Sequence, residues 1–514
     1  EEAMAKQLHC GADGVHHRCC VACQGHGQLF LRRRRATQGA PPLARCVCCE
    51  GTGLLPAGHL SEGRSLRPPA ASTAYSPTVA VVGGGIGGLA AALALQQRGV
   101  DVAVFERDGS FFERSQGYGL TLQQGWSSVR ALGVAEAVAA AGVSSTRHVA
   151  MDAQGRVLGT HGSAAQDSPP RGRRRNVHVP RQSLRAILHS RLSPGTVRWG
   201  HRFEGVLPSE NGGVEISFHE GTERVHAQLL VGADGIHSRV RQAVWESAGS
   251  AAGTTLRPLN MMVILGFAPC NHDLCAKGDT VFEVVDGTAR VYAMPFSPPP
   301  DLTTMWQLSF PLDAAEAQAL AALGGAALLD EARRRCRLWE SPIPELLWAT
   351  APVDVTGYPL YDRYTADALL DRFTPVGGPL AGRCTLVGDS AHPMAPFKAQ
   401  GANQALLDAT SLAAAVYDSD VGDAAAEENQ RWASATELAV RKPRRRSRQS
   451  LPSALVMYER QAVSRIGSKV KASREAAALL HSALALAPAD GPQTRAAAAR
   501  LALGHPPSTE GATS

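Results

Sequence analysis

The 514-residue sequence predicts an α/β fold with a parallel sheet flanked by helices, an inserted, mostly antiparallel sheet and a small cysteine-rich module before both. Three observations predict this arrangement. The apolar run Thr78–Val82 leads directly into a glycine-rich turn and then into a stretch rich in alanine and leucine. Several β-branched runs follow one another between about residues 255 and 375. Seven of the eleven cysteines lie within the first 50 residues.

The glycine-rich turn has the spacing of a dinucleotide-binding motif. Gly83-x-Gly85-x-x-Gly88 follows the first strand, and after the helix-forming stretch a second strand over Val102–Phe105 ends at Glu106. The first glycine permits the tight turn, the second lets the backbone approach a pyrophosphate, and the third lets helix and strand pack closely. An acid at the end of the second strand can bind an unphosphorylated ribose, which favours FAD or NAD over NADP. A Rossmann-like domain is therefore expected from residue 78 onward.

The composition is typical of a globular protein with two or three domains. Hydrophobic residues make up 44% of the chain, and the net charge is +6. The arginine runs at 32–35, 171–175 and 441–448 are interpreted as solvated loops rather than nucleic-acid-binding or nuclear-targeting segments, because aromatic residues are not interleaved with them. No uncharged apolar run reaches the ~18 residues of a membrane helix. The chain begins with Glu1, as a fragment or processed form would, and we assign no compartment.

Two CxxCxGxG units define a separate module over residues 1–60. Cys20, Cys23, Cys46 and Cys49 would supply four thiolates to one tetrahedral zinc ion, and the metal would provide most of the folding free energy of so short a segment. The paired units resemble the cysteine-rich zinc module of DnaJ-type co-chaperones, which implies binding of a protein partner or of unfolded chains. A redox-active or disulfide-bonded cluster is the alternative interpretation, and an additional cysteine beside each unit could replace a ligand.

Three further signals follow in a fixed order along the chain. A short extended segment leads into an amphipathic helix that begins near Arg181. An apolar strand then ends at Asp234, which is followed by glycine and a helix start. A third strand ends at Gly388-Asp389, and a proline-containing loop leads from there to a long helix after Gly401. Carboxylates at strand ends can bind the hydroxyl groups of a nucleotide, and the N-terminal end of a helix can stabilise a negatively charged ring.

In type, order and spacing, these signals resemble the FAD-dependent aromatic hydroxylases, the para-hydroxybenzoate-hydroxylase-like group of single-component flavin monooxygenases. The resemblance covers residues 78–420 and resumes over about 451–482. It implies that Asp389 binds the ribityl chain and that Asp234 serves both FAD and the nicotinamide cofactor. The cofactor-binding residues that the motifs and the resemblance imply are Gly83, Gly85, Gly88, Glu106, Arg107, Arg181, Asp234, Gly388, Asp389, Gly401 and Asn403.

The resemblance also implies a reaction. NAD(P)H would reduce FAD, O₂ would add at the flavin C4a atom, and the hydroperoxide would hydroxylate or epoxidise a small organic substrate, aromatic compounds included. Because the cofactor carries this chemistry, we assign no catalytic side chain. A flavin halogenase or reductase of related fold is one alternative, but the Trp-x-Trp-x-Ile-Pro stretch expected of a halogenase is absent. The other alternative is a catalytically impaired flavoprotein scaffold whose zinc module binds protein partners.

Residue Ala399 departs from the family pattern, which has glycine at this place in a Pro-x-x-Gly-Gln-Gly loop. If the position requires a positive φ, alanine costs on the order of 1 kcal/mol. This substitution, with the arginine-rich insertion, slightly favours the impaired scaffold.

The predicted boundaries are 1–60 for the cysteine module, 61–77 for a linker, 78–254 and 376–423 for the FAD-binding parts, 255–375 for the substrate-domain sheet, 424–450 for a basic insertion, 451–488 for a C-terminal helix and 489–514 for a disordered tail.

The substrate domain is expected to contain an antiparallel sheet followed by one helix over Ala314–Leu338. We interpret Met262, Trp306 and Tyr358 as core residues rather than pocket residues, because large apolar side chains in strands are more often core. The predicted strands of the sheet are Met261–Phe267, Thr280–Val285, Arg290–Met294 and Thr304–Phe310.

Overall fold

The computed structural model describes most of the chain from residue 76 to residue 488. Within that range the exceptions are 114–116, 163–175, 220, 252–254, 270–271, 277, 298–301, 364–371 and 423–448, and residues 161–162 are described by their backbone alone. Before residue 76, the backbone of five short strands is described: β1 (His9–Cys10), β2 (His16–Cys19), β3 (Gln28–Phe30), β4 (Leu43–Arg45) and β5 (Leu54–Pro56). They form a sheet of order β1-β2-β5 and the pair β3-β4. The predicted basic insertion lies almost entirely outside the described residues, and the predicted tail lies wholly outside them.

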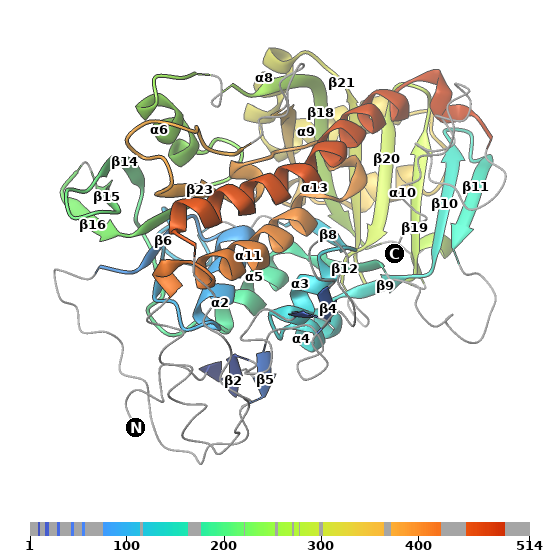
Figure 1. Ribbon diagram of the computed structural model, residues 1–514. Helices are drawn as coiled ribbons and strands as arrows, with labels where there is room; N and C mark the ends of the chain where they lie inside the picture. The colour runs from blue at the N-terminus through green and yellow to red at the C-terminus, as the bar shows by residue number, and fades with distance from the viewer. Residues whose placement is uncertain are drawn as a thin grey trace, which may run out of the picture.

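A five-stranded parallel sheet forms the centre of the dinucleotide-binding part (Figure 1). All residues of its strands β6, β7, β17 and β23 are buried, as expected for a parallel sheet that is covered on both faces. The register brings together segments that lie far apart in the sequence, because β17 pairs with β6 on one side and with β23 on the other. The strands in spatial order are β13 (Val197–Arg198), β7 (Val102–Phe105), β6 (Val79–Val82), β17 (Leu229–Gly232) and β23 (Cys384–Leu386).

Three long helices pack beside this sheet. Helix α2 (Ile86–Gln96) follows the glycine-rich turn, and its alanines and leucines are almost all buried against α11 (Gly401–Tyr417). Helix α13 (Leu451–Leu480) packs in turn on α11. Figure 1 shows α13 running from beside β23 across to the second sheet. The C-terminal part of the described chain therefore bridges the two sheets.

The second sheet has seven strands and is antiparallel except for one pair, which confirms the expected mostly antiparallel sheet. Strands β10 and β11 belong to it although they precede the predicted boundary at residue 255, and β10 pairs with β19 in parallel. In spatial order the strands are β11 (Val157–Gly162), β10 (Arg147–Asp152), β19 (Thr280–Val285), β20 (Arg290–Pro295), β21 (Thr304–Pro311), β18 (Arg257–Ala268) and β22 (Thr356–Asp362).

One face of the second sheet is covered by helices. Phe282, Trp306 and Leu308 pack there with side chains of α8 (Ala314–Ala322), α9 (Gly325–Arg335) and α10 (Ile343–Ala349). The prediction of one helix over Ala314–Leu338 is wrong, because Gly324 adopts a left-handed conformation with φ 85° that ends α8 and starts α9.

The remaining elements form two small sheets and several short helices. The small sheets are β8 (Gly119–Leu122), β12 (Asn176–Pro180) and β9 (Val143–Ser145), and β14 (Phe203–Pro208), β15 (Val214–Phe218) and β16 (Glu223–Ala227). The helices are α3 (Trp126–Ala131), α4 (Ala135–Ala141), α5 (Arg181–Ser190), α6 (Arg239–Ser247), α7 (Asp273–Ala276) and the 3₁₀ turns η1 (Pro352–Asp354), η2 (Gly388–Ser390), η3 (Pro396–Lys398), η4 (Asp420–Gly422) and η5 (Ala483–Leu486).

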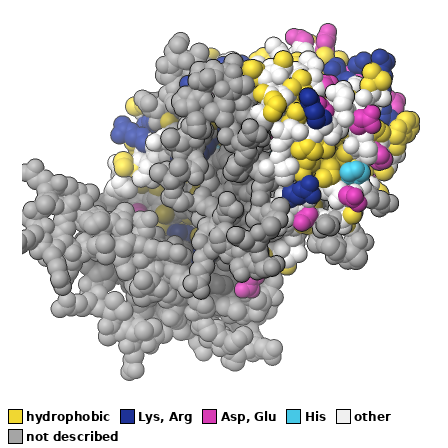
Figure 2. All heavy atoms as spheres, turned by 90° about the vertical axis from the view of Figure 1, so that its right-hand side faces the viewer, with side chains coloured by type: hydrophobic (Ala, Val, Ile, Leu, Met, Phe, Trp, Pro, Cys, Tyr) yellow, Lys and Arg dark blue, Asp and Glu magenta, His cyan; other side chains and the backbone are white. Residues whose placement is uncertain are grey.

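Among the described helices, none has the length and hydropathy needed to cross a membrane. Figure 2 shows the face of the molecule on the side of β10 and β11. Where described residues reach that face, hydrophobic, basic and acidic side chains are intermixed.

Candidate functional site

A single cavity of about 2020 Å³ extends from the carboxyl ends of the parallel strands to the uncovered face of the second sheet. Its walls include residues of the glycine-rich turn at one end and of β19 to β22 at the other. Glu106, Asp234 and Asp389, which end three strands that are distant in the sequence, all line it. The arrangement agrees with the expectation that these three carboxylates share one elongated site.

The glycine-rich turn forms a cradle at one end of the cavity. Gly83 has φ 113°, and a Cβ atom there would lie 2.4 Å from the carbonyl oxygen of Ala233. A Cβ atom at Gly88 would lie 1.9 Å from the carbonyl oxygen of Gly83, so this glycine serves the packing of α2 on the turn. A Cβ atom at Gly85 would lie 4.0 Å from the nearest surrounding atom, Nη2 of Arg181, which leaves open space beside the first turn of α2. Free N–H groups at such a helix start can bind the phosphates of a dinucleotide.

Glu106 is held in place beside this cradle by backbone donors. Its Oε2 atom accepts a hydrogen bond of 2.5 Å from the N–H of Gly84, and its Oε1 atom accepts one of 3.1 Å from Asp108. Each carboxylate oxygen keeps acceptor capacity for a ribose hydroxyl. Arg107 also lines the cavity at this end.

Asp234 and Asp389 lie at the next two strand ends. The carboxylate of Asp234 accepts hydrogen bonds from Ser238 Oγ at 2.6 Å and from the N–H groups of Arg239 and Val240, which ties it to the start of α6. The Asp389 side chain lines the cavity and is exposed to solvent. Desolvation by the surrounding protein raises the pKa of both carboxyls, and at Asp389 the electrostatic influence of His392 and Arg181 acts against this rise.

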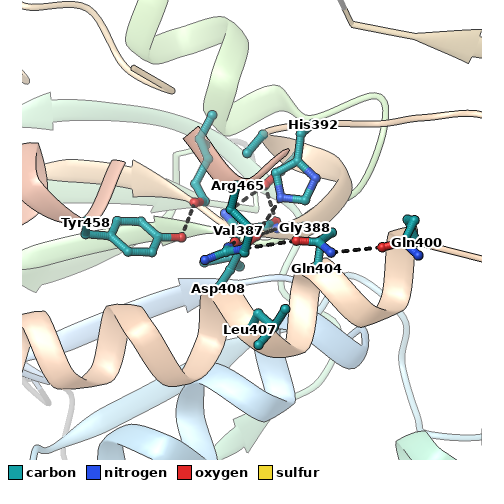
Figure 3. A network of polar contacts seen from close by, with 12 residues as sticks. Val387, Gly388, His392, Gln400, Gln404, Leu407, Asp408, Tyr458 and Arg465 are labelled. Atoms are coloured by element: carbon teal, nitrogen blue, oxygen red, sulfur yellow. Dashed lines mark hydrogen bonds and ion pairs between the residues drawn. The ribbon is translucent and has the colours of Figure 1, made fainter. Parts of the chain in front are cut away.

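A buried network holds the turn that carries Asp389 (Figure 3). Asp408 on α11 is fully buried and accepts hydrogen bonds from the N–H of Gly388 at 2.9 Å and from His392 Nε2 at 2.6 Å. Arg465 on α13 forms an ion pair with Asp408 and donates to Gln404 Oε1 at 2.9 Å. Gln404 Nε2 in turn donates to Gln400 Oε1 at 3.0 Å, next to Gly401. The network thus connects α13 to both the η2 turn and the start of α11.

Most of the predicted cofactor residues line the cavity, and two do not. The residues that line it are Gly83, Gly85, Glu106, Arg107, Arg181, Asp234, Gly388, Asp389 and Gly401. Gly88 lies in the packing contact described above, and Asn403 is fully buried away from the cavity. The side-chain Oδ1 of Asn403 accepts hydrogen bonds from the backbone N–H groups of Gln123 and Gly125 at 2.8 Å. Its side-chain Nδ2 donates to the backbone carbonyls of Thr121 and Ala399. Its observed contacts therefore fasten loops around the site, where direct cofactor contact was expected.

Ala399 adopts the strained conformation that the sequence comparison with the family suggested. Its φ is 51°, in the left-handed region, and it ends the η3 turn just before α11. Alanine is disfavoured there relative to glycine by about 1 kcal/mol. The cavity and the surrounding hydrogen bonds are nevertheless formed with alanine at this position.

The register of the second sheet determines which side chains face the cavity. Glu283 pairs with Tyr292, Tyr292 with Gln307, Gln307 with Leu265 and Leu265 with Thr356, and all five residues line the cavity. The neighbouring row on the same face consists of Val281, Met294 and Met305.

Tyrosine side chains contribute to the aromatic lining of this chamber. Tyr118, Tyr292 and Tyr358 line the cavity, and burial raises the pKa of each hydroxyl, that of Tyr292 to about 12. They are therefore neutral phenols at neutral pH. Met262 and Trp306 belong to the core, as predicted, but the interpretation of Tyr358 as a core residue is wrong because its strand turns it to the cavity.

Sequence reasoning missed several polar residues of the site. Arg185, four residues after Arg181 on the same helix, donates to the carbonyl of Gly84 at 2.8 Å and lines the cavity. Its helical spacing from Arg181 was the available signal. Arg290 donates from Nε to Glu283 at 2.7 Å, and the pair is buried in the wall of the chamber. His178 bonds Thr121 at 3.0 Å, and burial lowers its pKa to about 4, so the imidazole is neutral.

The predicted zinc ligands Cys20, Cys23, Cys46 and Cys49 lie outside the described residues, and the prediction for them stays untested by the structure.

Comparison with known proteins identifies the family of the main part of the chain. The family described as FAD binding domain matches residues 76–316 and 380–437. Phenazine 1,6-dicarboxylic acid hydroxylase of Lysobacter antibioticus is 30% identical over 364 residues, covering 66% of this chain and 83% of that protein. Aurachin C monooxygenase/isomerase of Stigmatella aurantiaca is 29% identical over 348 residues, covering 65% and 79%.

Solved structures show the same fold. The 2,6-dihydroxypyridine-3-hydroxylase of Arthrobacter nicotinovorans superposes with a TM-score of 0.62 at 19% identity, covering 82% of this chain and 96% of that one. HpxO of Klebsiella pneumoniae, complexed with FAD and uric acid, superposes with a TM-score of 0.60 at 22% identity, covering 79% and 89%. The chain therefore belongs to the family of FAD-dependent monooxygenases that carry this FAD binding domain.

Proposed function

We propose that this protein uses NADH or NADPH and O₂ to hydroxylate a small aromatic substrate while FAD is bound in the cavity. The observation that carries the proposal is the continuity of the cavity, which joins a dinucleotide cradle to a chamber lined with tyrosine, methionine and leucine. Both parts are needed, because the cofactor must reach the substrate. The named activities of the relatives, hydroxylation of a phenazine dicarboxylic acid among them, support an aromatic substrate.

The residues present fit FAD. The open space at Gly85 and the start of α2 would take the pyrophosphate, and Glu106 would bind the adenosine ribose. Asp389 would accept hydrogen bonds from the ribityl hydroxyls, and Arg181, which lies over the Tyr118 ring at 5.4 Å, would face the cofactor from α5. Bound FAD, once reduced by the nicotinamide nucleotide, supplies the activation of O₂.

The chamber under the second sheet would position the substrate and exclude water. Tyr118 and Tyr358 are neutral and present both ring surface and a hydroxyl donor, which suits a flat ring with polar substituents. Met294 and Met305 add an adaptable apolar wall beside them. The Glu283–Arg290 ion pair would present polar groups to the substrate without adding net charge to the chamber.

The test is made on the purified full chain. A flavin absorbance spectrum gives the FAD content, and oxidation of NADH and of NADPH is followed while phenols, aminohydroxybenzoates, quinolines and phenazine carboxylic acids are added one at a time. An aromatic compound that stimulates oxidation and gains one ¹⁸O atom from ¹⁸O₂ would support the proposal. A protein that binds FAD but releases only peroxide with every compound would contradict it.

We also propose that Cys20, Cys23, Cys46 and Cys49 bind one zinc ion and form a module that binds a protein partner. The support is the repeated CxxCxGxG spacing alone. Metal analysis of the full chain and of a Cys23→Ser, Cys49→Ser variant tests this proposal, because the variant should lose one equivalent of zinc. Equal zinc contents would contradict it.

A further inference from the structure

Two histidines and a glutamate to which the proposed FAD contacts assign no role come together at the edge of the small β14–β16 sheet. His201 lies just before β14, His219 directly follows β15, and Glu223 begins β16. One nitrogen of each imidazole and an oxygen of the carboxylate lie within 4.8 Å of one another. In the part of the chain that the structure describes, this is the group of three such side chains able to share a metal ion.

The hydrogen bonds of His201 determine which of its nitrogens is free. Nδ1 lies 2.8 Å from the carbonyl oxygen of Trp199, which can only accept, so Nδ1 carries the proton and donates. In the tautomer with its proton on Nδ1, Nε2 carries the lone pair that a metal ion needs, and this atom lies 3.2 Å from the Glu223 carboxylate. A metal ion bound between the two atoms would offset the repulsion between this lone pair and the carboxylate, as a proton on Nε2 also would. A histidine that donates its other N–H to a backbone carbonyl is the usual arrangement of a metal ligand.

The turn between β15 and β16 brings the second imidazole to the same carboxylate. His219 has φ 50°, a left-handed conformation that is uncommon for residues other than glycine. Its carbonyl accepts a hydrogen bond of 2.6 Å from the Thr222 hydroxyl, which stabilises the turn. As a result, His219 Nε2 lies 3.6 Å from Glu223 Oε2.

These separations fit a tetrahedral ion. Ligand bonds of about 2.0–2.1 Å at tetrahedral angles place ligand atoms about 3.3 Å apart, close to the observed 3.2 and 3.6 Å between the imidazole nitrogens and the carboxylate. His219 and Glu223 are partly exposed, which leaves one side open for ion entry and for a water ligand. Two imidazoles and one carboxylate favour zinc over calcium or magnesium, which prefer oxygen ligands throughout.

We propose that His201, His219 and Glu223 bind a zinc ion that fastens the β15–β16 turn to the segment before β14. This segment adjoins the adenosine end of the cavity, because the N–H of His201 donates to the carbonyl of Glu106 at 2.8 Å. The ring of His201 also packs against Phe105 and Phe218, each at 5.5 Å between ring centroids. The site is separate from the cysteine module. His201 also lines the adenosine end of the cavity, but occupation of the metal site does not depend on the proposed function.

Zinc bound at equilibrium is measured on the full chain after dialysis against buffered free zinc, for the wild type and for His219→Ala, Glu223→Gln and His226→Ala. His226 lies on the same strand as Glu223 but outside the cluster, where its Nε2 atom bonds the carbonyl of Gly212, so it is the matched control. We expect the wild type and His226→Ala to hold one more equivalent than the other two variants. The isosteric Glu223→Gln change keeps the comparison valid if His219→Ala does not fold.

Cobalt substitution distinguishes this site from the cysteine module. The difference spectrum between wild type and Glu223→Gln should show the visible bands of cobalt with nitrogen and oxygen ligands and no thiolate charge-transfer band. Affinity for the additional ion should fall at least tenfold in Glu223→Gln. Equal metal content in all four proteins, or a thiolate band in the difference spectrum, would overturn the proposal.

Discussion

Replacing Arg465 by methionine should weaken both the fold and the binding of FAD, and both effects should act through one buried carboxylate. Asp408 has no solvent exposure, and its three partners are the N–H of Gly388, His392 and Arg465 (Figure 3). Methionine keeps an unbranched apolar stem like that of arginine while removing the guanidinium group. The carboxylate then loses its arginine partner, and the turn that carries Asp389 loses part of its support.

The size of the effect follows from the burial of the two partners. Breaking a fully buried ion pair costs about 3–5 kcal/mol. The Arg465 side chain is 24% exposed, so water can partly replace it, and the expected loss of unfolding free energy is about 2–3 kcal/mol. If about half of this free energy is lost through displacement of the Gly388 turn, and so weakens FAD binding, the affinity for FAD should fall about tenfold, since 1.4 kcal/mol corresponds to a factor of ten.

The assay combines urea unfolding of the apoprotein with an FAD titration followed by flavin fluorescence. Asp408→Asn and the double variant complete a mutant cycle, in which the double variant should lose little more than Asp408→Asn alone, because Arg465 acts through that carboxylate. Arg460→Met is the matched control, since this arginine is exposed on the same helix. Additive losses in the double variant, or an equal loss of FAD affinity in Arg460→Met, would refute the reasoning.

Three further predictions concern backbone and titration. Ala399→Gly should raise the unfolding free energy by about 0.5–1 kcal/mol, because it relieves a positive φ, and an unchanged urea midpoint would contradict this. Gly85→Ala should abolish FAD binding with little change in apoprotein stability, because the added methyl group enters open space in the cradle. Gly88→Ala should destabilise the apoprotein itself by about 3 kcal/mol or more, because its methyl group would clash with the carbonyl of Gly83. Equal urea midpoints for the two variants would argue against the cradle. Burial lowers the pKa of His178 and His481 to about 4, so the unfolded chain binds more protons between pH 6.5 and 4 and stability should fall as the pH decreases through that window. Replacing both by glutamine should flatten this dependence.

Helix starts and strand ends that are determined by residues adjacent in the sequence were predictable from the sequence. The helix α5 begins at Arg181 as expected, because Pro180 restricts the preceding backbone and the apolar spacing starts there. The strands that lead to Asp234 and Gly388 were equally clear, because short apolar runs that end in turn residues are typical of buried parallel strands. Local signals of this kind give the strand ends, and the parallel topology then brings those ends to one edge.

The residues that line the substrate chamber could not be found in the same way. Tyr358 and Trp306 occupy similar apolar strands, yet one faces the cavity and the other the core. The choice depends on the register of strands that pair across the sheet, and a shift of one residue would exchange the two faces. Strand β10 illustrates the same limit, since its parallel pairing with β19 joins segments more than a hundred residues apart.

The place of α13 in the fold explains why a segment far beyond the flavin motifs belongs to the same functional unit. A cavity that extends under both sheets needs an element that holds the two sheets together. Helix α13 packs on α11, and its Arg474 forms an ion pair with Asp362 on β22 of the second sheet. Its last residue is followed by His481, which bonds Ser309 Oγ on β21 at 2.8 Å, while Arg465 reaches Asp408 beside the Gly388 turn. The helix therefore couples the chamber wall to the turn that carries Asp389, so changes along α13 should alter FAD affinity and substrate response together.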